Sequence, residues 1–401
     1  MRNSPTWCGV CAAAGSYPRR TQTAHRRLTI YEREMKGKSG LTAMTTLTDD
    51  MKARMRISYA LRRIPEADFA SLAPLGSVER GDIALARVEK IGKNGGLELP
   101  TGRRSTLHEG DVLAVVFGNR YATRQFEGYA RTDGDRCHML SMGGLAGMVE
   151  SKHASVADPT RLQLIGALAD ASGSPLRLQN YALAPDPAQK WPKVVVVCGT
   201  SMDAGKTYTT MSIILGLQRQ GHRVAGVKLT GTAAGRDVWS MVDAGACVGL
   251  DFVDGGFPST YLCTLDELLA LYNTLVTHAA SQGAEWVALE IADGLLQRET
   301  AALLQSQAFT STVSAWILAG GEPMAALSGA SILRGWGIEP LAVSGVVTMS
   351  ALGVEETKSA TGLSCLTARE LQSGALNAQI MLTTPGSALY PVNANVAGVG
   401  E

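Results

Sequence analysis

The sequence carries almost no net charge. Its 37 lysines and arginines are balanced by 36 aspartates and glutamates, which leaves a formal charge of +1. A chain this close to neutrality has no overall electrostatic attraction to nucleic acid or to a membrane surface. It also lacks any charge-free apolar run of about 18 residues, so no membrane-spanning helix is predicted. We therefore expect no membrane partner and no general affinity for nucleic acid.

Cysteine and histidine are scarce as well. The seven cysteines are an odd number without a repeated spacing, which favours buried thiols in a reducing cytoplasm over a disulfide framework. Cys8 and Cys11 have the spacing of a metal or redox pair, but no second pair or nearby histidine follows. None of the six histidines has a suitably spaced partner, and no nucleophile elbow occurs. The sequence therefore supports neither a histidine-metal centre nor a serine hydrolase.

Residues 1–43 differ in composition from the rest of the chain. They are rich in arginine, serine and threonine and contain no acidic residue before Glu32. This composition is typical of a disordered tail or an organellar transit segment, and it also fits a chain whose translation starts at Met44 or Met51. On each of these interpretations the segment carries no chemistry.

Residues 44–185 are predicted to form a β-rich domain with a leading helix. Apolar residues three to four positions apart predict the helix over 51–70. From 72 to about 150, short alternating segments between glycine turns predict a small barrel or sandwich. A mixed connector and a proline-containing linker follow, up to 192. The predicted strands of this domain are 81–89, 111–117 and 121–130.

From residue 193 to 401 the chain is predicted to form an α/β domain, because strand and helix patterns alternate. Alternation of this kind indicates a parallel sheet with helices on both faces, which binds ligands at the carboxyl ends of its strands. The predicted strands are 193–198, 224–229, 248–253, 286–291, 314–319 and 341–348, and the predicted helices are 205–219, 264–281, 298–308 and 323–335.

The loop Gly199-Thr200-Ser201-Met202-Asp203-Ala204-Gly205-Lys206-Thr207 joins the first of these strands to the first helix. Backbone N–H groups in such a loop, together with the helix N-terminus, bind phosphate. Lys206 is expected to reach the β- and γ-phosphates, and the Thr207 hydroxyl to bind Mg²⁺. The alternative is a glycine-rich turn that binds nothing. The residues expected to contact the nucleotide are Gly199, Thr200, Asp203, Ala204, Gly205, Lys206, Thr207 and Tyr208.

Charged residues end two of the other strands. Lys228 ends the segment 224–228 and is predicted to hold a γ-phosphate or an anionic substrate; otherwise it is a surface lysine. Glu290 ends the apolar segment 286–290, where a Mg²⁺-binding carboxylate is expected, and the alternative is a solvated loop acid. Asp293, three residues later, could serve in place of Glu290.

Three further aspartates follow predicted strands. Asp237 lies with Arg236 in a polar stretch after the second strand, where it is predicted to bind the metal or, alternatively, to cap a helix. Arg236 could supply charge to phosphate oxygens. Asp251 and Asp254, at the end of the third strand, are weaker candidates for the same site.

The lengthened loop, with five residues before Gly-Lys-Thr instead of four, resembles that of dethiobiotin synthetase and related P-loop NTPases such as the cobyrinic acid synthases. The segment Val224-Ala225-Gly226-Val227-Lys228 and the strand-end Glu290 resemble the same family over 193–300, and loosely to 350. The resemblance implies ATP and Mg²⁺ as cofactors, Thr207, Asp237 and Glu290 as metal ligands, and Lys206 and Lys228 as catalytic residues. It does not cover 1–190.

The chain departs from the family at three places, and the first and third of those given next help to shape the family's substrate pocket. Ser201-Met202 stand in place of Asp-Thr, Leu229 in place of proline, and Glu290-Ile291-Ala292-Asp293-Gly294 in place of Glu-Gly-Ala-Gly-Gly. The resemblance therefore implies nucleotide and metal binding for this chain more directly than it implies the dethiobiotin synthetase reaction.

The function that follows is an ATP- and Mg²⁺-dependent, ligase-like enzyme that activates a small molecule, a carboxylate by the resemblance. A small-molecule kinase is a variant, and a nucleotide-dependent switch or cofactor chaperone is the alternative. The region near 348–350 lacks the Asn-Lys-x-Asp guanine motif, which favours ATP over GTP. Nucleic-acid binding through the arginines at 103–131 is disfavoured because acidic residues lie among them. The expected partners are nucleotide and substrate, with a homodimer as a further option.

Overall fold

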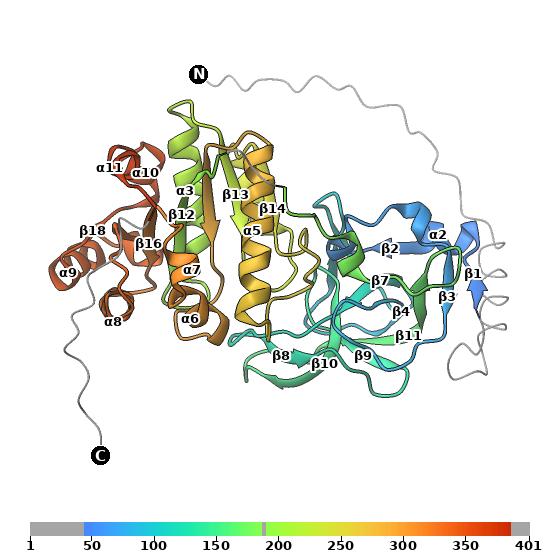
Figure 1. The fold of residues 1–401 in the computed structure, drawn as a ribbon. Helices are drawn as coiled ribbons and strands as arrows, with labels where there is room; N and C mark the ends of the chain where they lie inside the picture. Colours follow the sequence, from blue (N-terminus) through green and yellow to red (C-terminus); the bar gives the residue numbers. More distant parts are fainter. Residues whose placement is uncertain (1–43, 187–189, 386–401) are drawn as a thin grey trace, which may run out of the picture. The chain divides into compact units, whose positions relative to one another are not determined.

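The computed structural model describes residues 44–186 and 190–385, which belong to one compact unit. Along the chain, a β-rich half (44–186) comes first and an α/β half (190–385) follows (Figure 1). The predictions for residues 1–43, including Cys8 and Cys11, lie outside the described residues. None of the described helices is both long and apolar enough to cross a membrane.

The predicted helix over 51–70 is wrong. Helix α2 (Asp49–Arg54) ends after six residues, and β2 (Met55–Ile57) follows directly. Strand β2 pairs in parallel with β7 (Val112–Phe117), so hydrogen bonding to a distant strand outweighs the local helical spacing. Two of the apolar residues that gave the helical pattern, Tyr59 and Leu61, are buried in a 3₁₀ helix instead.

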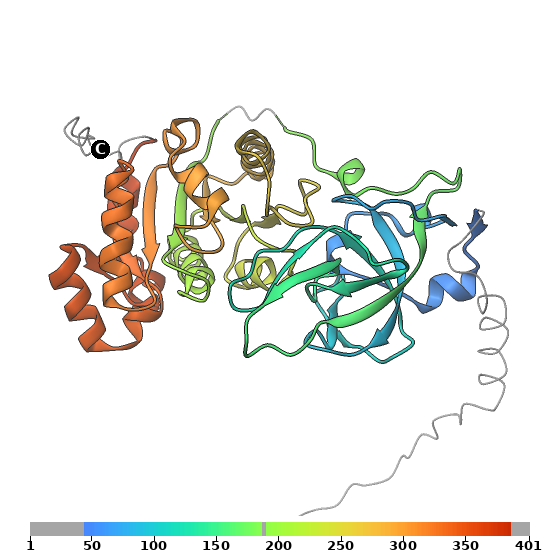
Figure 2. The same ribbon diagram turned by 90° about the horizontal axis from the view of Figure 1, so that it is seen from below.

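The β-rich half is built around a sheet that closes on itself (Figure 2). Its ring of strands runs β4, β7, β10, β9, β11 and back to β4, and its interior is filled by small and apolar side chains such as Ala84, Val115 and Met139. Strand β11 falls in the segment that was predicted to be a connector. The bounds are β4 Ile83–Lys90, β9 Arg136–Met139, β10 Leu145–Lys152 and β11 Thr160–Ala169.

Smaller strands complete this half. They are β1 (Thr45–Thr46), β3 (Ser71–Ala73), β5 (Gly96–Glu98), β6 (Arg104–Thr106) and β8 (Phe126–Tyr129). Within the predicted strand over 121–130, only β8 is a strand. The residues before β8 form a loop that lines the candidate site.

The α/β fold class is confirmed. All strands of the second sheet are parallel, in the order β14-β13-β15-β12-β16-β17-β18. Their interiors are fully buried runs, as a sheet covered on both faces requires. The bounds are β12 Lys193–Gly199, β13 Val224–Lys228, β14 Val248–Asp251, β15 Trp286–Glu290, β16 Ala315–Ala319, β17 Ala342–Ser344 and β18 Ser364–Cys365.

Helices cover both faces of this sheet. One face packs against α5 (Leu265–Ser281), α6 (Arg298–Leu304), α7 (Gln307–Thr310) and α8 (Pro323–Gly335). The other packs against α3 (Lys206–Gln218), α4 (Arg236–Asp243), α10 (Ala368–Gln372) and α11 (Asn377–Leu382). Helices α4, α9 (Ala351–Thr361), α10 and α11 were not predicted.

Buried polar contacts join the two halves. Asp251, fully buried at the end of β14, accepts hydrogen bonds from the Tyr59 hydroxyl (2.8 Å) and from Arg62 (2.8 Å). Arg62 also binds the buried Asp254 (2.6 Å). One apolar core runs through both halves beneath these contacts. Asp251 and Asp254 therefore fix the junction, and the prediction that they are site residues is wrong.

We expect Arg62→Met to lower the free energy of unfolding by about 3–5 kcal/mol, because it removes the guanidinium that both buried carboxylates bind and leaves Asp254 only the longer contact with Arg63 (3.8 Å). Urea unfolding followed by tryptophan fluorescence measures the effect. Arg54→Met removes an exposed ion pair with Asp50 and is the matched control, expected to change stability by less than about 1 kcal/mol. Equal stability of the two variants would contradict the assignment.

Candidate functional site

The glycine-rich loop has a defined shape between β12 and α3. Asp203 and Gly205 have positive φ angles of 65° and 97°. A Cβ atom on Gly205 would lie 2.9 Å from the Cα of Gly345, so only glycine fits here. The backbone N–H of Val346 donates to the carbonyl of Ala204 at 3.0 Å. The segment after β17 therefore supports the loop from behind.

Lys206 begins α3 and lies almost entirely within the site. Its side chain is 6% exposed, and its Nζ donates to the carbonyl of Ser201 at 2.8 Å. The aliphatic part of the side chain passes so close to Gly199 that a Cβ there would lie 2.8 Å from its Cγ. Burial lowers the pKa of Lys206 below the usual lysine value. The ammonium is thus held at the loop by contacts that a bulkier residue at 199 would disturb.

The strand register brings Lys228 and Glu290 together. They are direct partners where β13 and β15 pair, at the carboxyl ends of both strands. Lys228 is 8% exposed; its Nζ forms an ion pair with Asp237 and lies 3.9 Å from the Oε1 of Glu290. Glu290 is 2% exposed and accepts a hydrogen bond from the Thr207 hydroxyl (3.0 Å). The alternatives of a surface lysine and a solvated acid are therefore wrong.

Asp237 is the second residue of α4, and Gly235 is the N-cap of that helix, so the capping alternative is wrong as well. Burial alone would raise the pKa of Asp237, but the Lys228 ammonium outweighs it and holds the pKa below its usual value. Burial raises the pKa of Glu290, which Lys228 only partly offsets. The pKa values of the two carboxylates are thus shifted in opposite directions: Asp237 forms the direct ion pair with Lys228, whereas Glu290 is buried and 3.9 Å from that ammonium.

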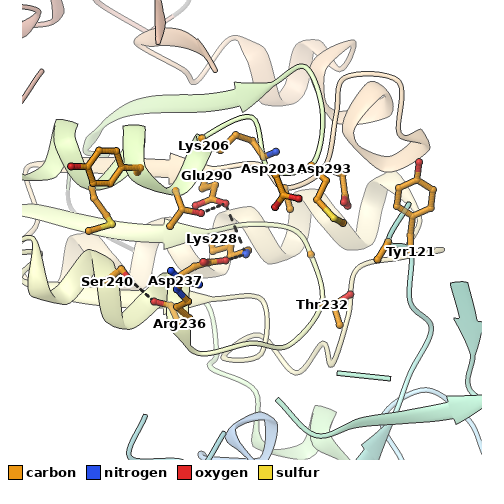
Figure 3. Close-up of a pocket in the computed structure, with 18 of the residues that line it drawn as sticks. Tyr121, Asp203, Lys206, Lys228, Thr232, Arg236, Asp237, Ser240, Glu290 and Asp293 are labelled. Carbon is orange, nitrogen blue, oxygen red and sulfur yellow. Dashed lines mark hydrogen bonds and ion pairs between the residues drawn. The ribbon is translucent and has the colours of Figure 1, made fainter. Parts of the chain in front are cut away.

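These residues line one cavity of about 470 Å³ (Figure 3). The cavity receives Asp203, Lys206, Thr207 and Tyr208 from the loop and the start of α3. From the strand ends and the segments after them come Lys228, Arg236, Asp237, Glu290 and Asp293. The structure thus gathers most of the predicted site residues around one space, on the carboxyl-end side of the parallel sheet.

Sequence reasoning missed the contribution of the β-rich half. Arg120, Tyr121 and Ala122, in the loop before β8, line the same cavity, and Figure 3 shows Tyr121 entering it from that side. In the sequence, Arg120 is one of several arginines among acidic residues and has no motif around it. Only the docking of the two halves brings it to the loop, so no local signal could have found it.

Asp293 lines the cavity together with Glu290. It has a positive φ of 61°, a conformation that aspartate tolerates better than most residues. Its neighbour Gly294 packs against the loop, where a Cβ would lie 2.7 Å from the carbonyl oxygen of Thr200. Burial raises the pKa of Asp293, and the charges of Lys206 and Lys228 oppose that rise. A carboxylate of raised basicity therefore faces the cavity beside the loop.

The donor set fits Mg²⁺. The Oε2 of Glu290 is buried and has no hydrogen-bond partner among the described residues. Together with the Thr207 hydroxyl and Asp237 it offers hard oxygen ligands, which Mg²⁺ prefers and usually supplements with water and phosphate oxygens. The described residues contain no group of three or more His, Cys, Asp or Glu side chains suited to hold a metal by themselves.

No protein-family model and no curated protein sequence matches the chain. Several solved structures overlap with about half of it. A DUF1611 family protein from Anabaena variabilis is 14% identical over 50% of this chain and 60% of that one, with a TM-score of 0.34. The signal recognition particle 54 kDa protein from Aeropyrum pernix, in complex with GDP, is 20% identical (49% and 48% covered; TM-score 0.32). A ParA family ATPase from Chlorobium tepidum is 9% identical (49% and 95% covered; TM-score 0.27). The chain thus covers less than two thirds of the first two proteins.

Proposed function

We propose that the chain binds Mg·ATP at the loop Gly199–Thr207 and transfers its γ-phosphoryl group to a small acceptor. The observation that carries the proposal is the shared cavity of Lys206, Lys228, Thr207, Asp237 and Glu290. Its test is turnover of Mg·ATP by the purified full chain, with GTP as the competing nucleotide. The division of the chain into two domains at 186–192 is part of the proposal, with the β-rich domain supplying one wall of the site.

The loop and the two lysines have separate tasks in this account. Backbone N–H groups of the loop and Lys206 bind the β- and γ-phosphates in the ground state. Lys228 stabilises the charge that moves onto the transferred group and the leaving oxygen. Mg²⁺, when bound by Thr207, Asp237 and Glu290, supplies further positive charge next to the phosphates.

The favoured reaction is the activation of a carboxylate, as the resemblance to the synthetases suggests. A carboxylate oxygen forms a bond to the γ-phosphorus, and the bond from that phosphorus to the bridging oxygen breaks. The electron pair leaves with ADP, and the product is an acyl phosphate. An amine then displaces phosphate from the acyl carbon and loses one proton. Asp293, a buried carboxylate of raised pKa in the same cavity, is the group we assign to take that proton.

A nucleotide-dependent switch is the second candidate, and one set of contacts favours it. The segment that leads to Asp237 touches the β-rich half: the N–H of Gly235 donates to Glu98 (2.7 Å), and Ser141 donates to the carbonyl of Ala233 (2.9 Å). A shift of Asp237 between nucleotide states would reach the β-rich half through these bonds. Hydrolysis that stays slow with every small acceptor tried would favour the switch over the enzyme.

We expect Lys206→Ala to abolish turnover and to weaken Mg·ATP binding about tenfold or more, since it removes a charge-assisted contact to phosphate. Isothermal titration calorimetry measures the affinity. Lys358→Ala, at an exposed ion pair on α9, is the matched control and leaves both quantities unchanged. Wild-type affinity and turnover in Lys206→Ala would refute the phosphate-binding loop.

Glu290→Gln keeps the size of the side chain but removes the charge offered to the metal. We expect turnover to require about tenfold more Mg²⁺ than in the wild type, because one charge-assisted ligand is lost. A magnesium titration of the rate at saturating ATP measures the shift. Glu285→Gln removes an exposed carboxylate before β15 and serves as the control. An unchanged magnesium requirement would rule out Glu290 as a ligand.

Lys228→Met is expected to lower kcat with little change in ATP affinity, because its charge matters most as the phosphoryl group moves. It also leaves Asp237 and Glu290 without their buried counter-ion, at a cost of about 3–5 kcal/mol. Added Mg²⁺ should therefore raise the melting temperature of Lys228→Met more than that of the wild type. Lys90→Met, at an exposed position, is the control. A normal kcat and an equal magnesium response would contradict both roles.

A further inference from the structure

A second, smaller cavity of about 280 Å³ adjoins the phosphate cavity. The two share Tyr121 and Ala122, which line both of them. A cavity near the lower end of the size range of small-molecule sites suits a small metabolite. The remaining residues that line it are Thr123, Gln125, Glu127, Ser151, Lys152, His153 and Tyr261.

Arg120 lies where the two cavities meet. It lines the phosphate cavity, and its guanidinium donates to the side-chain oxygen of Gln125 (2.9 Å), which lines the second cavity. A further N–H group donates to the carbonyl of Leu140. The guanidinium is thus held by neutral oxygens at the boundary of the two spaces.

Arg120 forms no ion pair within the described part of the chain, although the carboxylate of Asp293 acts on its charge from a longer distance. The residue is only 7% exposed, and its Nε is buried without a hydrogen-bond partner. Burial lowers the pKa of Arg120 to about 10, and the charge of Asp293 offsets this only in part, since the two form no ion pair. Burying a guanidinium without an ion-paired carboxylate is costly, so its position favours a ligand that brings a negative charge within hydrogen-bond distance.

The charged residues that line the second cavity are less suited than Arg120 to bind a negatively charged group. Lys152 is engaged with Asp158 at 2.5 Å. Glu127 accepts hydrogen bonds from the hydroxyls of Tyr129 (2.6 Å) and Ser151 (2.7 Å), so it would repel an anion deeper in the cavity. A negatively charged group is therefore disfavoured deep in the second cavity, and the guanidinium of Arg120 favours one at the boundary, where it also opposes the charge of Asp293.

Two aromatic rings line the second cavity. The rings of Tyr121 and Tyr261 lie 5.5 Å apart between centroids, tilted by 47°. Their faces suit an apolar or planar part of a ligand, and Gln125 and His153 add polar groups.

We propose that the second cavity is the acceptor site, and that Arg120 holds the carboxylate of a small acceptor at its boundary with the phosphate cavity. The inference rests on the proposed function, because it places the reacting carboxylate beside the γ-phosphate. The body of the acceptor lies against the rings of Tyr121 and Tyr261. Arginine suits the role since its planar fork pairs with a carboxylate through two hydrogen bonds.

The test uses the full chain loaded with Mg²⁺ and the non-hydrolysable analogue AMP-PNP. Acetate, succinate and benzoate, each beside its uncharged amide, are titrated by saturation-transfer NMR. We expect the carboxylates to bind at least tenfold more tightly than the amides, and benzoate more tightly than acetate. In Arg120→Gln the carboxylates should fall to the level of the amides. Arg131→Gln, at an exposed ion pair with Glu150, is the control and should retain the preference.

The outcomes separate the two proposals. Failure of AMP-PNP to bind would refute the proposed function, whereas AMP-PNP binding with equal affinity for carboxylates and amides would overturn the acceptor site alone. A folded Arg120→Gln that keeps the preference would also overturn it. Should Arg120→Gln fail to fold, Tyr261→Leu decides: the account expects it to remove the advantage of benzoate over acetate, and an unchanged advantage contradicts the proposal.

Discussion

The pairing of β13 with β15 is the constraint on which the site depends. Because the strands are parallel and Lys228 is in register with Glu290, an ammonium and a carboxylate are buried side by side at the edge of the sheet. Burying either charge without the other would strongly destabilise the fold. Asp237, at the start of α4, forms a second ion pair with the same ammonium. The hydroxyl of Thr207 donates a hydrogen bond to Glu290 and so connects this group to the glycine-rich loop.

The β-rich half contributes to the same cavity. It is joined to the α/β half through the buried bonds of Arg62 and Tyr59 to the end of β14, the strand next to β13. The same docking carries Arg120 and Tyr121 into the cavity and holds the segment that leads to Asp237. Without the β-rich half, the cavity would lack this wall. The β-rich half thus lines part of the cavity, and in the function we propose it selects the acceptor.

The α/β sheet and the glycine-rich loop could be predicted from the sequence, because buried strands and long helices have strong periodic patterns of apolar residues. It also led to Lys228, Asp237 and Glu290, since polar residues that end apolar strands must meet at one edge of a parallel sheet. It failed at 51–70, where pairing of β2 with β7 overrides helical spacing. It also misassigned Asp251 and missed Arg120, because both depend on contacts between residues far apart in the chain.

The central claim is that the loop and the strand-end carboxylates bind a nucleoside triphosphate together with its metal. The most direct measurement is a calorimetric titration of the full chain with ATP, carried out with Mg²⁺ and again after chelation of divalent cations. The account predicts saturable binding of one equivalent that is lost or greatly weakened by the chelator. Absence of binding at millimolar Mg·ATP, or binding that is indifferent to the metal, would contradict it.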